Sequence, residues 1–182
     1  MARAGDVIVN PIMGARIVFR AVAADTGGSL LEFDFHLRAG GVVAVDHLHP
    51  QQEERFEVIS GLMRGHVDGS PHVLGPGATS VVGPGVPHAW RNASTDEAHL
   101  RVQFRPALRV EDMFETVFAL GAQGRTNDKG VPDFPFRLAM LAEFSDEVRP
   151  AAMPAGVHRI LVRTFKRKHT LAPDGARPRS SG

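Results

Sequence analysis

The chain of 182 residues contains no cysteine and no tyrosine. It therefore has no disulfide, no thiolate ligand, no thiol nucleophile and no phenol for proton transfer. Lys and Arg number 21 against 20 Asp and Glu, so the net charge is +1, and no general attraction to nucleic acid or membrane is expected. No apolar run approaches the length of a membrane span, and residues 2–6 lack the apolar core of a signal peptide. We therefore expect a cytoplasmic protein that binds neither nucleic acids nor membranes.

Glycine and proline are frequent instead, with 19 and 13 residues, which is typical of short strands joined by tight turns. Residues 30–38 give the clearest strand signal, because apolar and polar side chains alternate strictly and predict one buried and one solvent-facing side. The apolar set is Leu31, Phe33, Phe35 and Leu37, and the polar set is Glu32, Asp34, His36 and Arg38. Further strands are expected at residues 7–9, 16–20, 61–67, 73–74, 79–82, 88–92 and 98–105.

Two histidines and a glutamate stand on either side of a predicted turn. His47 and His49 are one residue apart, so on a strand they point from the same face. Pro50 suits a turn, and an apolar run that begins at Glu54 is expected to return antiparallel and to bring its carboxylate beside the imidazoles. Alternation along that run favours Glu54 over Glu53 as the inward residue. Two neutral nitrogens and one anionic oxygen that converge in this way make a site for a divalent metal.

A second segment supplies another histidine, because the Gly/Pro-rich turn at residues 83–87 delivers His88 to the start of a strand. Together the two segments resemble the paired motifs of the cupin family, of the germin and quercetinase type. The matching residues are Gly41, His47, His49, Glu54 and Gly61 in the first motif and Gly77, Gly85, His88 and Asn92 in the second. Gly83 departs from the pattern, since cupins usually have proline there, but Pro84 and Pro87 still restrict the loop.

The resemblance covers roughly residues 30–105 and implies a mainly β fold, a double-stranded β-helix (cupin) barrel with one metal ion at its centre. The implied ligands are His47, His49, Glu54 and His88. This donor set leaves one or two coordination positions open and suits Mn, Fe, Co, Ni, Cu or Zn. The residues expected to face the barrel interior and the substrate are Phe33, Phe35, Phe56, Met63, Trp90, Val102 and Phe104, an apolar lining that favours an aromatic or enolic substrate over a free sugar.

The family spans several reactions, so the resemblance does not choose one. Our first hypothesis is a dioxygenase-type enzyme whose substrate chelates the metal, with Glu54 as the residue that can transfer a proton. A non-redox cyclase, isomerase or lyase remains open, in which the metal acts as a Lewis acid. A non-enzymatic sensor or storage protein for a small molecule remains open too.

The character of the chain changes after the predicted barrel at residues 1–106. Apolar residues at helical spacing predict a helical extension at residues 107–172, with helices at 110–120, 136–144 and 157–168 and with Gly121 as the stop of the first. Residues 173–182 are expected to be disordered. Short amphipathic helices need a surface to cover, and we expect strand edges at residues 7–9 and 98–105. The extension and these edges together predict a homodimer that uses the outer sheet face.

Overall fold

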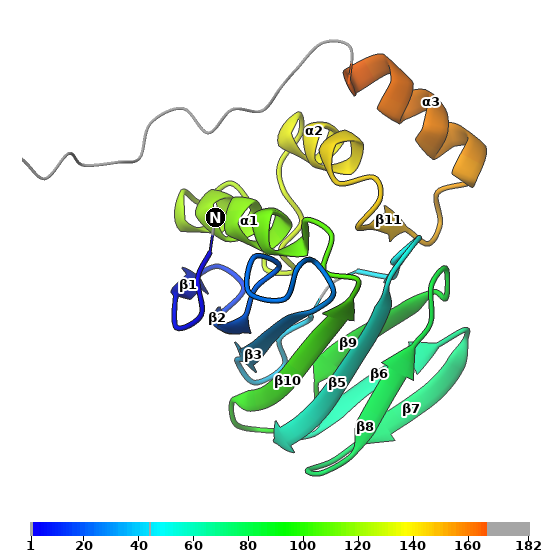
Figure 1. The fold of residues 1–182 in the computed structure, drawn as a ribbon. Coiled ribbons are helices and arrows are strands. Elements are labelled where there is room, and N and C mark those ends of the chain that lie inside the picture. The colour runs from blue at the N-terminus through cyan, green and yellow to red at the C-terminus, as the bar shows by residue number, and fades with distance from the viewer. Residues whose placement is uncertain (1, 44, 167–182) are drawn as a thin grey trace, which may run out of the picture.

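The computed structural model describes residues 2–43 and 45–166, which form two β-sheets followed by a helical extension (Figure 1). The first sheet has the order β1-β2-β3-β10-β5-β8 and the second the order β11-β4-β9-β6-β7, and all pairings are antiparallel. The strands are β1 Val7–Asn10, β2 Ala15–Ala21, β3 Leu31–Leu37, β4 His47–Leu48, β5 Glu53–Ser60, β6 Met63–Val67, β7 Ser70–Leu74, β8 Thr79–Val82, β9 His88–Asn92, β10 Ala98–Arg105 and β11 Arg149–Pro150. The helices are α1 Val110–Ala122, α2 Phe136–Glu143 and α3 Ala155–Lys166.

The core lies between the two sheets and is built by the alternation seen in the sequence. The apolar residues of β3 are all buried, and they meet buried residues of the facing sheet such as Met63 and Trp90. Gly61 closes the turn between β5 and β6 with a φ of +93°, and an added Cβ would lie 2.8 Å from that of Ala98. The predicted fold class, a mainly β cupin-type barrel with a helical extension, is confirmed.

One expectation about the sheet edges is wrong. Strand β10 lies in the middle of its sheet, between β3 and β5, and the edges are β1 and β8. Alternation along a strand predicts which side chains share a face, but it carries no information on which strands become neighbours.

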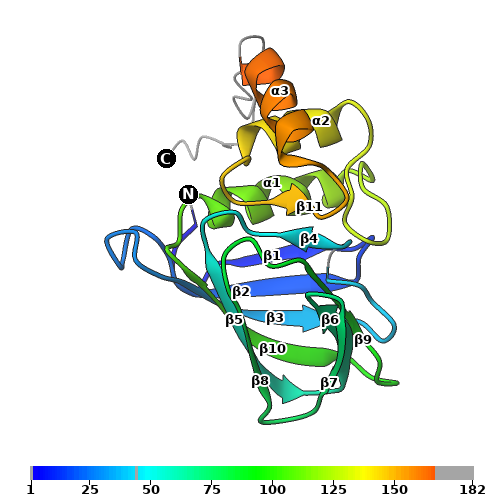
Figure 2. The same ribbon diagram turned by 90° about the vertical axis from the view of Figure 1, so that its right-hand side faces the viewer.

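The extension covers one end of the pair of sheets (Figures 1 and 2). Helix α1 packs against β1, α2 packs against α3, and β11 adds a strand beside β4. Within the described residues, no helix is long and apolar enough to cross a membrane. The predicted tail at residues 173–182, and the last two residues of the predicted third helix, lie outside the described part of the chain.

Gly121 is not the stop that the sequence suggested, because α1 continues through it to Ala122. A Cβ built on Gly121 would lie 2.2 Å from the side-chain amide of Asn10. Asn10 is fully buried, and its Oδ1 accepts hydrogen bonds of 3.1 Å from the N–H groups of Ile12 and Met13. Glycine at this position therefore lets the helix approach the turn after β1.

Gly121→Ala is expected to lower the free energy of unfolding by about 2 kcal/mol, because the added methyl group collides with the fixed side chain of Asn10. The matched control is Gly156→Ala in α3, where an added Cβ has nothing within 4 Å. That variant should gain a few tenths of a kcal/mol, up to about 1, from helix propensity. Urea denaturation of both variants checks the pair, and equal effects would contradict the packing described for Gly121.

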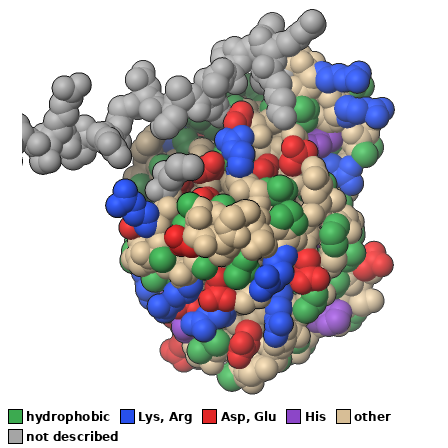
Figure 3. Space-filling view, in the orientation of Figure 1, with side chains coloured by type: hydrophobic (Ala, Val, Ile, Leu, Met, Phe, Trp, Pro, Cys, Tyr) green, Lys and Arg blue, Asp and Glu red, His purple; other side chains and the backbone are tan. Residues whose placement is uncertain are grey.

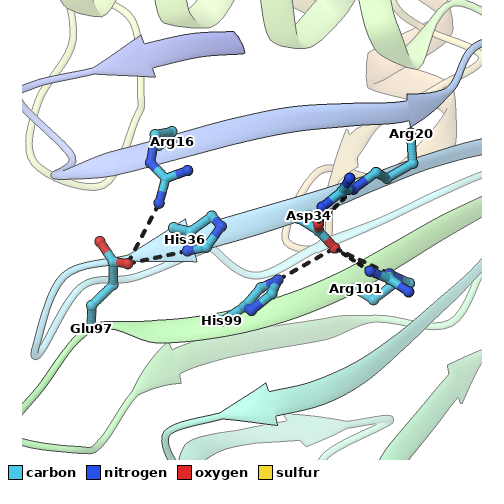
Figure 4. Close-up of polar contacts among 7 residues, drawn as sticks. All are labelled: Arg16, Arg20, Asp34, His36, Glu97, His99 and Arg101. Atoms are coloured by element: carbon cyan, nitrogen blue, oxygen red, sulfur yellow. Dashed lines mark hydrogen bonds and ion pairs between the residues drawn. The ribbon is translucent and has the colours of Figure 1, made fainter. Parts of the chain in front are cut away.

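The outer face of the β3 sheet carries cations and anions side by side (Figure 3). Asp34 was expected on the solvent side of β3, but only 1% of its surface is exposed. Two arginines cover it: Arg20 Nε lies 2.6 Å from Oδ2, and Arg101 Nη2 lies 3.0 Å from Oδ1 (Figure 4). His99 Nε2 is 3.3 Å from the same Oδ1. Cross-strand neighbours have therefore buried a residue whose position in the alternation predicted exposure.

Burial by itself raises the pKa of Asp34, but the hydrogen bonds from Arg20 and Arg101 and the contact with His99 outweigh it and hold the pKa below its usual value. A carboxylate with a depressed folded-state pKa contributes stability above its unfolded pKa of about 3.9, and this contribution is lost as the pH falls through the lower folded value.

Asp34→Asn is expected to lower the free energy of unfolding at pH 7 by about 2 kcal/mol, since it leaves two guanidinium groups without their buried partner. The difference from wild type should shrink below about pH 4, where the carboxyl becomes protonated in the unfolded chain, and should continue to shrink down to the lower folded-state pKa. Asp133→Asn is the control, because its ion pair with Arg125 is solvent-exposed on both sides and should contribute under 1 kcal/mol. A difference for Asp34→Asn that stayed constant from pH 7 to pH 3 would contradict this role.

Candidate metal centre

Four side chains from three strands meet between the two sheets. His47 lies on β4, His49 follows that strand, Glu54 is on β5 and His88 begins β9. Residues His47 and His88 are direct partners in the β4–β9 ladder. Strand β5 does not pair with β4 as the sequence suggested, because the chain crosses to the other sheet after the turn. Glu54 therefore reaches the imidazoles across the interior and not along a hairpin.

The donor atoms of the four residues all lie within 4.8 Å of one another. Glu54 Oε2 is 2.7 Å from Nε2 of His88 and 3.6 Å from Nε2 of His49. These three atoms are buried and have no well-oriented hydrogen bond among the described residues. Buried polar atoms without partners are costly, and a cation between them would satisfy all three. The cluster is compatible with a metal ion.

Each imidazole is oriented by a backbone carbonyl on its Nδ1 side. The acceptors are Val45 O for His47 at 2.9 Å, Glu147 O for His49 at 2.6 Å and Val86 O for His88 at 3.0 Å. A carbonyl can only accept, so Nδ1 carries the proton and the Nε2 lone pair is free to bind a cation. The three rings are therefore held in the tautomer that metal binding needs.

Glu54 and His47 have the charge states of metal ligands. Burial by itself raises the pKa of Glu54, but contacts with His49 and His88 outweigh it and hold the pKa well below its usual range. Burial and the neighbouring imidazoles lower the pKa of His47 to about 3. Burial also lowers the pKa of His88, but the contact with Glu54 outweighs this and raises it. A cation bound at Nε2 of His88 would compete with protonation of that ring.

The extension holds the cluster in place through strand pairing and hydrogen bonds. No motif in the sequence predicted these contacts. Residues His47 and Leu48 pair with Pro150 and Arg149 of β11. The carbonyl that orients His49 belongs to Glu147, 98 residues further along the chain. Gln51, in the turn before β5, donates a 3.0 Å hydrogen bond to Asp146. Backbone carbonyls exist at every residue, so no sequence motif marks the one that supports a ligand.

A cavity of about 200 Å³ opens beside the cluster, between the barrel and the extension. His47, His49 and Glu54 line it, and its other walls are mostly apolar. The apolar residues are Met13, Val43, Val45 and Phe104 from the barrel segment and Met113, Phe114, Val117, Phe118, Val131, Pro132, Met140, Leu141, Val148 and Pro150 from the extension. The cavity is therefore shaped mainly by residues that the barrel motifs do not include.

The predicted substrate contacts occupy three different places. Phe104 lines the cavity beside the cluster. A second, much smaller cavity of about 20 Å³ lies deeper in the barrel, and it is lined by Phe33, Phe35, Phe56, Trp90 and Val102. Met63 is fully buried in the core and lines neither cavity. Helical spacing at residues 110–120 predicted an apolar face, and four of its residues line the cavity: Met113, Phe114, Val117 and Phe118.

Comparison with known proteins agrees with this architecture. Residues 33–104 match the family model described as the Cupin domain. A predicted oxalate decarboxylase from Thermotoga maritima superimposes with a TM-score of 0.51 at 14% identity, over 58% of this chain and 98% of that one. An RmlC-like cupin from Shewanella frigidimarina gives 0.50 at 18% identity, over 61% and 92%. KdgF from Halomonas sp. gives 0.46 at 19% identity, over 51% and 79%.

No curated protein matches the chain. The two similarities with TM-scores of 0.51 and 0.50 establish the fold alone, since their identities are below 25%. This chain has the cupin fold, with the two-sheet barrel of that class and a helical extension after it.

His49→Ala is expected to abolish stoichiometric binding of a divalent transition metal, because it removes one donor from a set of four. Elemental analysis of the purified variant and a thermal melt with added Zn²⁺ check this. Wild type should gain about 2.7 kcal/mol of stability when free metal stands at a hundred times its dissociation constant, and the variant should gain almost none.

His36→Ala is the control for this prediction. His36 lies on the outer sheet face, where its Nδ1 is 3.1 Å from a Glu97 oxygen, so its loss should leave the metal content unchanged. Full metal occupancy in His49→Ala would contradict the assignment of the cluster as the metal site.

Proposed function

We propose that this protein is a metal-dependent enzyme of the cupin fold that acts on a small aromatic or enolic compound in a dioxygenase-type reaction. The observation that carries the proposal is the position of the His-His-Glu-His cluster at the end of an apolar cavity. Pockets of this kind, with a few convergent polar groups in an apolar wall, are the usual form of small-molecule sites.

His47, His49, Glu54 and His88 would hold one divalent transition metal ion, namely Mn, Fe, Co, Ni, Cu or Zn. A redox-active metal held there would bind a substrate through adjacent oxygens and would tune its electron density toward reaction with dioxygen. The apolar walls would exclude water and orient the ring of the substrate. Glu54 would accept the proton that the substrate hydroxyl loses, because it is the only carboxylate among the described residues that line the cavity.

The composition of the cavity wall favours oxidative chemistry over a non-redox reaction. Among the described residues that line it there is no hydroxyl group and no imidazole outside the cluster. A cyclase, isomerase or lyase must usually move protons between several substrate atoms, and it would have to rely on Glu54 for each transfer. A dioxygenase-type reaction needs only the first deprotonation. The metal motif, of the germin and quercetinase type, supports the same choice.

We also propose that two copies of the chain form a homodimer through the outer face and edge of the β1 sheet. Strand β1 is an edge strand, and Val7 and Val9 are 53% and 51% exposed on it. Open apolar edges of this kind favour pairing with another chain. Static light scattering at micromolar concentration tests the proposal, and a monomer mass would overturn it.

Oxygen consumption by protein reconstituted with Fe, Mn, Ni or Cu should follow the loss of a flavonol, catechol or β-diketone substrate. Glu54→Gln is expected to reduce the rate at least a hundredfold, because the amide accepts no proton and carries no charge. Glu53→Gln is the matched control: Glu53 is the preceding residue of β5 and does not line the cavity, so its rate should equal that of wild type.

Product formed without oxygen uptake would point to a cyclase, isomerase or lyase instead. Tight binding of these compounds without turnover would point to a sensor or storage protein.

A further inference from the structure

The cavity beside the metal cluster contains two charged residues that the proposed reaction does not use. They are Lys129, in the loop before α2, and Arg137, in the first turn of α2. Every other charged or titratable residue of the wall belongs to the cluster itself. Both are cations from the extension, so this part of the cavity wall is positively charged. Apart from these two residues and the metal cluster, the wall is mostly apolar.

Two other arginines of the extension, Arg109 and Arg125, have carboxylate partners, whereas Lys129 and Arg137 have none among the described residues. Arg109 Nη1 lies 2.7 Å from a Glu143 oxygen, and Arg125 Nε lies 3.4 Å from an Asp133 oxygen. Within residues 2–43 and 45–166, neither the Lys129 ammonium nor the Arg137 guanidinium has a hydrogen bond or an ion pair. Their charges are therefore available to a ligand.

The backbone that carries Lys129 is held in place. Asn127 Oδ1 accepts hydrogen bonds of 3.0 Å from the N–H groups of Lys129 and Val131. Gly130 packs against Met13, which itself lines the cavity, since a Cβ added at Gly130 would lie 2.5 Å from the sulfur. This short loop therefore packs against Met13 of the barrel.

Arg137 is tied to the same segment. The N–H group of Arg137 donates a 2.9 Å hydrogen bond to Asp133 O, and that of Asp133 donates one of 2.9 Å to Arg125 O. The start of α2 and the preceding loop are thus one connected piece of backbone that carries two unpaired cations at the cavity.

We infer that the natural ligand is an organic anion with a carboxylate at the end that faces Lys129 and Arg137. Its other end would carry the adjacent oxygens that bind the metal, and an apolar body would lie between the two. A guanidinium group binds a carboxylate through two parallel hydrogen bonds, and an ammonium group adds a point charge. The inference rests on the proposed function for the metal-binding end only, so the two can fail separately.

The test uses protein loaded with zinc, which binds catechols without oxidising them, and three pairs of probes that differ in length. The acids are 3,4-dihydroxybenzoate, 3-(3,4-dihydroxyphenyl)propanoate and caffeate, and each is compared with its methyl ester by isothermal titration calorimetry. Acid and ester share the chelating catechol and differ only in the charge. Because Lys129 and Arg137 are both exposed, water screens their charges, and the best-fitting acid should bind only about fivefold tighter than its ester.

The double variant Lys129→Gln with Arg137→Gln should bring the acid-to-ester ratio to about one and leave the ester affinity unchanged. Arg159→Gln is the matched control, because Arg159 is an exposed arginine of the adjacent helix α3 that does not line the cavity. It should keep the wild-type ratio. The ester affinity also reports that the double variant is folded.

Three results would overturn the inference: no preference for any acid in wild type, a preference that survives the double variant, or no binding of any acid. A different result concerns the proposed function alone. If the preference for the acid were unchanged in His49→Ala, which should lack the metal, the anion site would stand and chelation of the ligand by the metal would be contradicted.

Discussion

The hydrogen bond between Nδ1 of His49 and the carbonyl of Glu147, 2.6 Å long, is the contact on which the rest of the site depends. Strand β4 has only two residues and could not hold two histidines in place alone. It is held on one side by β9 and on the other by β11, which belongs to the extension. The same extension supplies most of the cavity wall. Barrel and extension are therefore joint parts of one site, and the barrel motifs describe only half of it.

Two of the buried carboxylates, Asp34 and Glu54, are compensated in different ways. Asp34, on the outer sheet face, is neutralised by two guanidinium groups that stay half exposed, at 51% and 40%. Glu54, in the interior, has only imidazoles near it, and two Nε2 atoms and its own Oε2 lack aligned hydrogen bonds. A buried charge without a partner is strongly unfavourable. Asp34 has its partners in the two arginines. Glu54 has no such partner, and a bound metal ion would supply the compensating positive charge.

Much of the site could be predicted from the sequence, because two short motifs contain all four candidate ligands. The spacing of His47, His49, Glu54 and His88 predicted four side chains that meet, and they do. Alternation predicted the buried face of β3. Alternation could not predict which distant strands become neighbours. It therefore missed the central position of β10 in its sheet and the arginines that bury Asp34. Gly121 was misinterpreted for the same reason, since its closest neighbour, Asn10, is 111 positions away in the chain.

We propose that the four residues bind a metal ion that is reached from the apolar cavity. X-ray absorption spectroscopy of the protein reconstituted with one equivalent of zinc or cobalt can test this. The spectrum should show a single metal environment with about three imidazole nitrogens and one carboxylate oxygen at roughly 2.0–2.2 Å. A first shell made of water oxygens alone, unchanged when His49 or His88 is replaced, would contradict it.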